Sequence, residues 1–121
     1  MNVRALRVLV ADDEPDVCQY LRRYLERRRF EVVCVYDGAE ALKVIEGECF
    51  DFFLLDISMP HLTGLELIEA ARRRCPDSKI VLISGFPTVT DETIKQFGGD
   101  AFIHKPIQLG EIDRILLKGE K

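Results

Sequence analysis

The sequence predicts an α/β fold in which a single doubly wound, five-stranded parallel sheet is surrounded by five helices. Length and composition are the first observation: 121 residues, 47% hydrophobic and 31% charged, suit one compact globular domain. The second observation is that apolar runs of strand length alternate with amphipathic stretches of helix length. Continuously apolar strands joined by helices are typical of a parallel sheet covered on both faces, so this alternation predicts five strand–helix units.

The first half of the chain contains two of these units. Leu6–Ala11 is largely apolar and includes β-branched valines, which predicts a strand, and Pro15 suits the first turn of the helix that follows. Phe30–Val35 is a second strand, and its mixed composition favours a place near an edge of the sheet. Asp37-Gly38 then breaks the chain before a short helix. Apolar residues at helical spacing mark the two helices at Val17, Leu21, Tyr24 and Leu25, then at Ala41, Leu42 and Ile45.

The second half contains three strands and three helices. The third helix is expected to end near Arg74, because Pro76 cannot continue it, and a weaker helix over Asp91–Phe97 is expected to end at Gly98-Gly99. The strands are Phe52–Leu55, Ile80–Ile83 and Ala101–Ile103. The apolar stripes of the third and last helices are Leu65, Ile68 and Ala71, and Leu109, Ile112, Ile115 and Leu116.

The charge balance and the apolar runs exclude two kinds of partner. Seventeen Lys and Arg residues against twenty-one Asp and Glu residues give a formal net charge of −4, whereas phosphate contacts with nucleic acid need a basic face. No apolar run approaches the roughly 20 residues that a membrane-spanning helix requires, and arginines interrupt the N-terminal segment. We therefore expect a cytoplasmic domain that binds neither nucleic acid nor a membrane directly.

The four cysteines, Cys18, Cys34, Cys49 and Cys75, are widely spaced, with no C-x-x-C pair and no cluster of histidines. This spacing argues against a zinc site, and the chain has too many core residues to be a disulfide scaffold. Each cysteine is expected to be a small buried or half-buried apolar residue in a reducing cytoplasm.

Residues that carry chemistry follow four of the predicted strands. They are Asp12-Asp13-Glu14 after the first strand, Asp56 after the third, Ser84 after the fourth and Lys105-Pro106 after the fifth. Ligands bind beyond the carboxyl ends of the strands in an open parallel sheet, where these groups would meet. Taken singly, each has an ordinary structural explanation: a helix cap, a turn, a loop start or a solvated lysine.

Taken together, the acidic residues need a positive charge, because clustered carboxylates repel one another. Hard oxygen ligands at one edge of a sheet suit Mg²⁺. A carboxylate beside Mg²⁺, with a lysine and a hydroxyl opposite, can accept a phosphoryl group and become an aspartyl phosphate.

The motifs Asp12-Asp13, Asp56-Ile57-Ser58-Met59-Pro60-x-x-x-Gly64, Ser84-Gly85 and Lys105-Pro106 resemble the receiver domain of two-component response regulators. The resemblance covers essentially the whole chain, residues 1–121. It implies a flavodoxin-like sheet of strand order 2-1-3-4-5. It also implies that the domain is a signalling module that assists its own phosphorylation and slow autodephosphorylation, and not a conventional enzyme.

The resemblance implies a role for each site residue. Asp56 would accept the phosphoryl group from a sensor histidine kinase or a histidine phosphotransfer protein. Mg²⁺ would be held by Asp13 and Asp56, by Asp12 directly or through water, and by the backbone carbonyl of Ser58. Lys105, joined to Pro106 by a cis bond, would pair with the phosphoryl oxygens.

The resemblance also implies a switch. Ser84 would move to hydrogen-bond the phosphoryl group, and Phe102 would turn inwards and change the face made by helix four, strand five and helix five. Ser58 and Phe86, two residues after Asp56 and Ser84, lie nearest the path of the hydrolytic water. Neither is suited to orient that water, so we expect a long-lived phosphorylated state. Phe86 either shields the phosphoryl group from solvent or only packs against the loop.

A downstream protein target or an output domain would bind the altered face. A homodimer that forms through the same face is also possible. No DNA-binding or enzymatic output domain is expected within the 121 residues, and both a single-domain regulator and a receiver cut from a longer chain fit the sequence. The region Phe86–Gly99, with few strong helix formers, leaves the form of the output surface open.

Three other functions remain as alternatives. A haloacid-dehalogenase-type phosphatase also uses Asp, Ser or Thr, Lys and Mg²⁺, but its motif D-x-D follows its first strand. A flavodoxin-like FMN binder needs a phosphate-cradling loop after the first strand, where Asp12-Asp13-Glu14 would repel phosphate. A constitutive protein-binding module would keep the fold without the switch.

Overall fold

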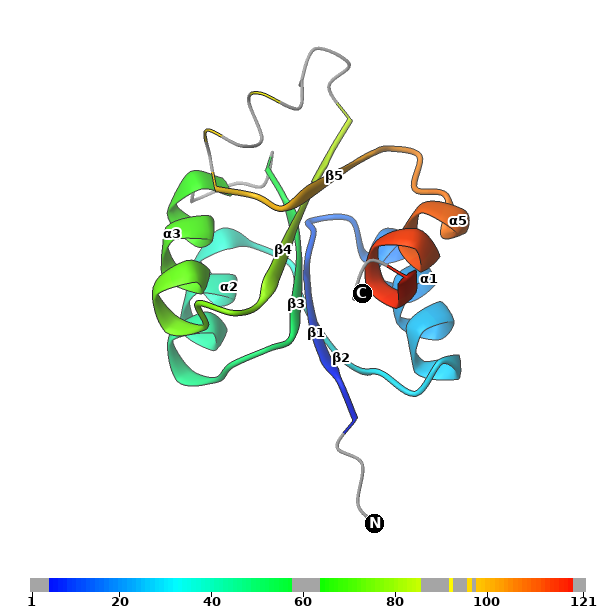
Figure 1. The fold of residues 1–121 in the computed structure, drawn as a ribbon, viewed down its shortest axis with the longest axis horizontal. Helices are drawn as coiled ribbons and strands as arrows, with labels where there is room; N and C mark the ends of the chain where they lie inside the picture. The colour runs from blue at the N-terminus through cyan, green and yellow to red at the C-terminus, as the bar shows by residue number, and fades with distance from the viewer. Residues whose placement is uncertain (1–4, 58–63, 86–91, 93–95, 97, 119–121) are drawn as a thin grey trace.

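Across residues 5–57, 64–85, 92, 96 and 98–118, which the computed structural model describes, five parallel strands form one sheet in the order β2-β1-β3-β4-β5 (Figure 1). This order confirms the expected topology, and β2 lies at an edge as its mixed composition predicted. The strands are β1 (Arg7–Ala11), β2 (Glu31–Val35), β3 (Phe52–Asp56), β4 (Lys79–Ser84) and β5 (Ala101–His104).

Helices cover both faces of the sheet, with α2 and α3 on one side and α1 and α5 on the other (Figure 1). The helix expected over Asp91–Phe97 lies outside the described residues, except for Glu92 and Gln96. The helices are α1 (Pro15–Arg27), α2 (Gly38–Gly47), α3 (Gly64–Arg74) and α5 (Leu109–Ile112), which continues as the π-helical segment η1 (Asp113–Lys118). None of the helices in the described ranges has the length and the apolar run needed to cross a membrane.

Alternation of side chains along the strands divides the core into two layers. On β1, Val8 and Val10 face α1 and α5, whereas Leu9 and Ala11 face α2 and α3. The strands β3 and β4 alternate in the same way, which is why their sequences are apolar throughout. Because all the strands are parallel, their carboxyl ends meet at one edge of the sheet.

Local capping explains where the first two helices begin. Pro15 is the first residue of α1, and Glu14 precedes it without a side-chain cap. The N-cap of α2 is Asp37, whose Oδ1 accepts a hydrogen bond from the backbone N–H of Glu40 at 2.8 Å. Asp12 is therefore not the cap of α1, and its carboxylate is available to the carboxyl edge of the sheet.

The expectation that each cysteine is a small buried or half-buried apolar residue in a reducing cytoplasm is wrong for Cys49, which is exposed, and for the oxidised pair that it forms with Cys75. Cys49 and Cys75 form a disulfide, whereas Cys18 is a buried free thiol and Cys34 a half-buried one. The disulfide partners are 26 residues apart in sequence, and packing of α3 against β3 brings their Cα atoms within 5.8 Å. Linear spacing carries no signal for such a pair, because the pairing depends on where two elements meet in space.

Candidate functional site

The site lies at the carboxyl edge of the sheet, where residues from β1, β3, β4 and the segment after β5 converge. Backbone hydrogen bonds extend the pairing of the strands into this edge: Asp12 N–H donates to Val35 at 3.1 Å, and Lys105 N–H donates to Ser84 at 2.8 Å. Asp12, Asp56 and Ser84 are almost completely buried there, with 0%, 1% and 0% of their surface exposed. Polar side chains this deeply buried need hydrogen-bond or ionic partners, so their clustering at one edge of the sheet indicates a functional site.

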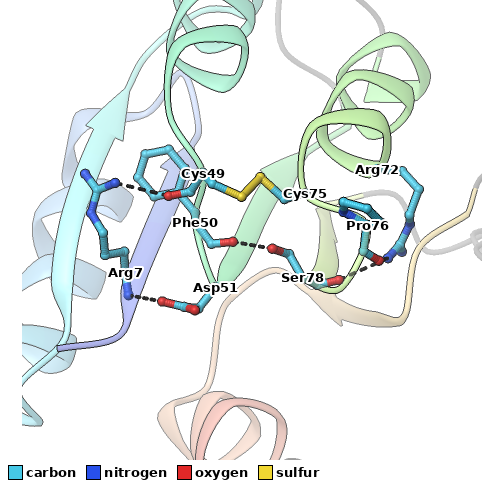
Figure 2. Close-up of a disulfide and its surroundings, with 8 residues drawn as sticks. All are labelled: Arg7, Cys49, Phe50, Asp51, Arg72, Cys75, Pro76 and Ser78. Carbon is cyan, nitrogen blue, oxygen red and sulfur yellow. Dashed lines mark hydrogen bonds between the residues drawn. A yellow bond between two sulfur atoms is a disulfide. The ribbon is translucent and has the colours of Figure 1, made fainter. Parts of the chain in front are cut away.

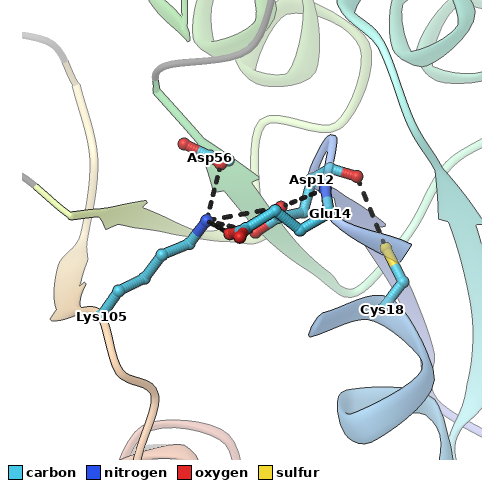
Figure 3. A network of polar contacts seen from close by, with 5 residues as sticks. All are labelled: Asp12, Glu14, Cys18, Asp56 and Lys105. Atoms are coloured by element: carbon cyan, nitrogen blue, oxygen red, sulfur yellow. Dashed lines mark hydrogen bonds and ion pairs between the residues drawn. The ribbon is translucent and has the colours of Figure 1, made fainter. Parts of the chain in front are cut away.

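Lys105 is the cation at the centre of this site (Figure 3). Its Nζ lies 2.6 Å from Oε1 of Glu14, 3.0 Å from Oδ2 of Asp56 and 3.1 Å from Oδ2 of Asp12. Burial lowers the pKa of Lys105, but hydrogen bonds to Glu14, Asp56 and Asp12 outweigh it and raise this pKa above its ordinary value. The amine therefore stays protonated and serves as a counterion to these carboxylates.

Asp12 carries a buried carboxylate whose two oxygens are unequally satisfied. Its Oδ1 accepts hydrogen bonds from the backbone N–H of Glu14 at 2.9 Å and from Lys105 at 3.4 Å. Its Oδ2 is buried and accepts no hydrogen bond of normal geometry, although Lys105 lies nearby. Burial is the largest cause that raises the pKa of Asp12, and the charge of Asp56 raises it further. Lys105, shared with Glu14 and Asp56, therefore compensates the Asp12 charge only in part.

Three carboxylates at this edge are arranged so that they can hold a metal ion. One oxygen from each of Asp12, Asp13 and Asp56 lies within 4.8 Å of the others, and Asp13 is exposed while the other two are buried. Lys105 supplies a single positive charge against these three groups and Glu14. Hard oxygen donors, an excess of negative charge and an unsatisfied Asp12 Oδ2 fit a divalent cation such as Mg²⁺.

Most of the predicted site residues are brought together by the fold. Asp12, Asp13, Asp56, Ser84 and Lys105 all reach the carboxyl edge, and the bond between Lys105 and Pro106 is cis as expected. Ser58 and Phe86 lie outside the described residues.

Phe102 lies on β5, where it is half-buried and packs against the α2–α3 side of the core. Its ring meets the ring of His104 edge to face, with the centroids 4.4 Å apart. The register of the sheet pairs Ser84 with His104, so the expected switch residues occupy neighbouring strands.

Two contributions to the site were missed by reasoning from sequence. Glu14 was noted as part of an acidic triplet, but its 2.6 Å ion pair with Lys105 was not predicted. Cys18 donates its thiol to the backbone carbonyl of Asp12, with Sγ and O 3.7 Å apart, and so links α1 to the loop after β1. The run Asp12-Asp13-Glu14 could have identified Glu14 as a site residue from sequence, whereas no sequence pattern pointed to Cys18.

A hollow of about 700 Å³ borders this site on the α1 side. Its walls come from α1 and from the segment after β5, and it reaches Lys105. The residues that line it are Glu14, Asp16, Val17, Tyr20, Gly85, Lys105, Pro106 and Ile107.

Comparison with known proteins gives a consistent family match. The family model of the response regulator receiver domain matches residues 8–117. The chain is similar to the transcriptional regulatory protein TctD of Salmonella typhimurium (strain SL1344), with 31% identity over 109 residues that cover 89% of this chain and 49% of TctD. The chain thus spans about half the length of TctD and of other curated transcriptional regulators that it matches.

Two similar solved structures are described with bound groups. A response regulator from Burkholderia pseudomallei, with a phosphorylated aspartic acid, a calcium ion and citrate, has 30% identity and a TM-score of 0.82 over 90% of this chain and 65% of that chain. TrrA of Thermotoga maritima, in complex with Mg²⁺ and BeF, has 29% identity and a TM-score of 0.81 over 93% of this chain and 97% of that chain.

Proposed function

The chain belongs to the response regulator receiver domain family, and from this premise we propose that it is a phosphoacceptor signalling module in which Asp56 takes a phosphoryl group from a phosphohistidine. The observation that carries the proposal is the buried ion pair between Asp56 and Lys105, set beside Asp12 and Asp13 in one acidic cluster. The phosphorylated aspartate of the Burkholderia pseudomallei regulator supports the same chemistry here.

The proposed reaction uses the residues of the carboxyl edge directly. A carboxylate oxygen of Asp56 attacks phosphorus, the bond from phosphorus to the donor's imidazole nitrogen breaks, and the electron pair leaves on that nitrogen. The protonated amine of Lys105, 3.0 Å from Asp56, would pair with the phosphoryl oxygens. Asp12, Asp13 and Asp56 would hold Mg²⁺, with the backbone carbonyl of Ser58 as a ligand proposed from sequence. When bound, the ion would neutralise negative charge on the phosphoryl group.

The phosphoryl group would be read by the residues next to the site. A phosphoryl group carries nearly two negative charges, so the hydroxyl of Ser84 would be drawn towards it. Movement of Ser84 would allow the Phe102 ring to turn inwards and alter the surface at β5 and the helices beside it. Ser58 and Phe86 are the positions that we propose, from sequence, to slow hydrolysis.

The partners follow from the same premise. We propose a sensor histidine kinase or a histidine phosphotransfer protein as donor, and a cytoplasmic location beside it. Each chain would carry one phosphoryl group as a stoichiometric acceptor and would not act as a conventional enzyme. The altered surface would be read by a separate protein, by a second copy of the chain, or by an output domain of a longer chain.

The test is phosphorylation by acetyl phosphate with Mg²⁺, followed by intact-mass spectrometry. We expect the mass of one phosphoryl group to be added to the native chain and none to the Asp56→Asn variant. Asp77→Asn is the matched control, because Asp77 is an exposed acid at the other end of the sheet. Labelling of Asp56→Asn equal to that of the control would refute the assignment, and continuous release of phosphate without a stable adduct would indicate a phosphatase instead.

A further inference from the structure

A disulfide joins Cys49 to Cys75 (Figure 2). It lies at the end of the sheet opposite the phosphoacceptor site. Cys49 lies just before β3, whereas Asp56 ends that strand, and Cys75 directly follows the last residue of α3. The bond therefore closes a covalent loop that contains all of β3, including Asp56, and all of α3. None of the phosphoryl chemistry proposed above uses these two cysteines.

Non-covalent contacts hold the Cys49 side of the bond in place. Arg7 donates from its guanidinium to the backbone carbonyl of Cys49 at 3.1 Å and from its backbone N–H to the carboxylate of Asp51 at 2.8 Å. The same guanidinium lies over the ring of Phe50, 4.6 Å from the centroid. Ser78 donates its hydroxyl to the carbonyl of Phe50 and so ties this segment to the Cys75 side (Figure 2).

Hydrogen bonds that do not involve the disulfide also hold the Cys75 side in place. Its backbone N–H donates to Ala71 at 2.8 Å, and its carbonyl accepts from the N–H of Ser78 at 3.1 Å. Arg72 donates to the carbonyls of Pro76 and Ser78 at 3.4 and 3.0 Å and fixes the turn after α3. None of these hydrogen bonds uses a sulfur atom, so we expect both backbones to stay anchored when the sulfur–sulfur bond breaks, with the two thiols as neighbours that can form the bond again without refolding.

The two sulfur positions differ in access. Cys49 is exposed, whereas only 3% of the surface of Cys75 is exposed. A pocket of about 390 Å³ is lined by both cysteines and by Arg74 and Pro76, which leaves room for a small thiol beside the bond. Exposed Cys49 is therefore the expected point of attack by a thiolate from solvent, with buried Cys75 as the expected leaving sulfur.

We propose that Cys49 and Cys75 form a thiol–disulfide exchange site whose substrate is a low-molecular-weight thiol. A thiolate RS⁻ attacks Sγ of Cys49, the bond to Cys75 breaks, and its electron pair leaves on Sγ of Cys75, which takes up a proton. A second thiolate attacks the sulfur of the R group on Cys49, which releases Cys49 as a thiol and forms RSSR. The protein gains two electrons while two RSH molecules are oxidised, and RSSR drives the reverse reaction.

This site would connect the redox state of the surroundings to the segment that carries the phosphoacceptor. In the oxidised form, the covalent loop restricts the unfolded chain and so stabilises β3 and α3 against unfolding. In a compartment rich in reduced thiols the pair would be present as two thiols, which reconciles the bond with the cytoplasmic location proposed above. Thiol–disulfide exchange is a separate reaction from phosphoryl transfer and can be measured without phosphorylation.

The first test equilibrates the native full-length chain with glutathione and glutathione disulfide at ratios from strongly reducing to strongly oxidising. After acid quenching and alkylation, peptide mass spectrometry follows all four cysteines separately. We expect the bond between Cys49 and Cys75 to form and open reversibly without unfolding. Absence of the bond under oxidising conditions would overturn the proposal, and so would a bond that opens only in denaturant.

A second test measures which sulfur is attacked. Exposed to glutathione disulfide, the Cys75→Ser variant should form a mixed disulfide at Cys49 at least about tenfold faster than the Cys49→Ser variant forms one at Cys75. Far-UV circular dichroism checks that both variants are folded. If one variant does not fold, the cysteine that carries the transient mixed disulfide in the native chain identifies the sulfur that is attacked. Equal rates at the two positions, or a transient adduct on Cys75, would overturn the assignment of Cys49.

Discussion

Lys105 Nζ lies 3.0 Å from Oδ2 of Asp56, although 49 residues separate the two in sequence. Lys105 follows β5 and Asp56 ends β3, so the contact spans the end of the intervening strand β4. The amine also contacts Asp12 and Glu14, which makes it the shared counterion of three carboxylates. Four predictions depend on this arrangement and on the surface beside it.

Removal of the shared counterion should destabilise the metal-free protein. In Lys105→Met, Asp12 and Asp56 remain buried without their cation, and we expect the free energy of unfolding to fall by about 1–3 kcal/mol at neutral pH. Urea unfolding without Mg²⁺ measures this loss. Lys43→Met, which removes an exposed lysine on α2, is the control and should change stability little. Equal stability of the two variants would show that Lys105 is not needed as a counterion.

Removal of the exposed Asp13 carboxylate should weaken metal binding without lowering the stability of the fold. In Asp13→Ala, one ligand of the acidic cluster is lost but repulsion among the remaining carboxylates is relieved. We expect Mg²⁺ affinity to fall about tenfold or more, which corresponds to about 1.4 kcal/mol, with the metal-free protein equally or more stable. Calorimetric titration and thermal unfolding measure the two effects. Asp16→Ala is the control, and a metal-free Asp13→Ala protein that does not fold would show a structural role instead.

The raised pKa of Asp12 should make the stability of the metal-free protein depend on pH. The folded protein holds the Asp12 proton more tightly than the unfolded chain, so stability falls as pH rises from the ordinary pKa of 3.8 through the raised pKa. We therefore expect Asp12→Asn to be more stable than the native chain at neutral pH. This advantage should vanish as pH falls towards 3.8 and shrink when Mg²⁺ is added. Urea unfolding across this range, with and without Mg²⁺, measures it. A variant that is less stable than the native chain at neutral pH would contradict the prediction.

The ring pair on β5 should report the proposed switch. Phe102 and His104 lie edge to face with centroids 4.4 Å apart, so a turn of the Phe102 ring must change the surroundings of the imidazole. With beryllofluoride and Mg²⁺, we expect the NMR signals of both rings to shift. The Phe30–Phe52 pair on the opposite face serves as an internal reference that should not move. Shifts that persist in Asp56→Asn, or no shift in the native chain, would reject the switch.

The sequence by itself determined where the strands lie and which chemical groups follow them. The pattern of apolar residues predicted all five strands to within two residues at each end, because burial on both faces demands continuous apolar runs. Parallel topology then placed Asp12, Asp56, Ser84 and Lys105 at one edge, since parallel strands end on the same side. The strand order itself was implied by resemblance to a family and not by periodicity.

Only the tertiary structure decided how these groups pair in space. It buried Asp12 while leaving Asp13 exposed, although the two are adjacent in sequence and equal in chemistry. It also joined Glu14 to Lys105, and Cys49 to Cys75, from distant parts of the chain. The physical reason is that periodicity reports only which face of an element is buried. A pairing between elements depends on how they pack against each other and on where each side chain then points, and no local pattern encodes that.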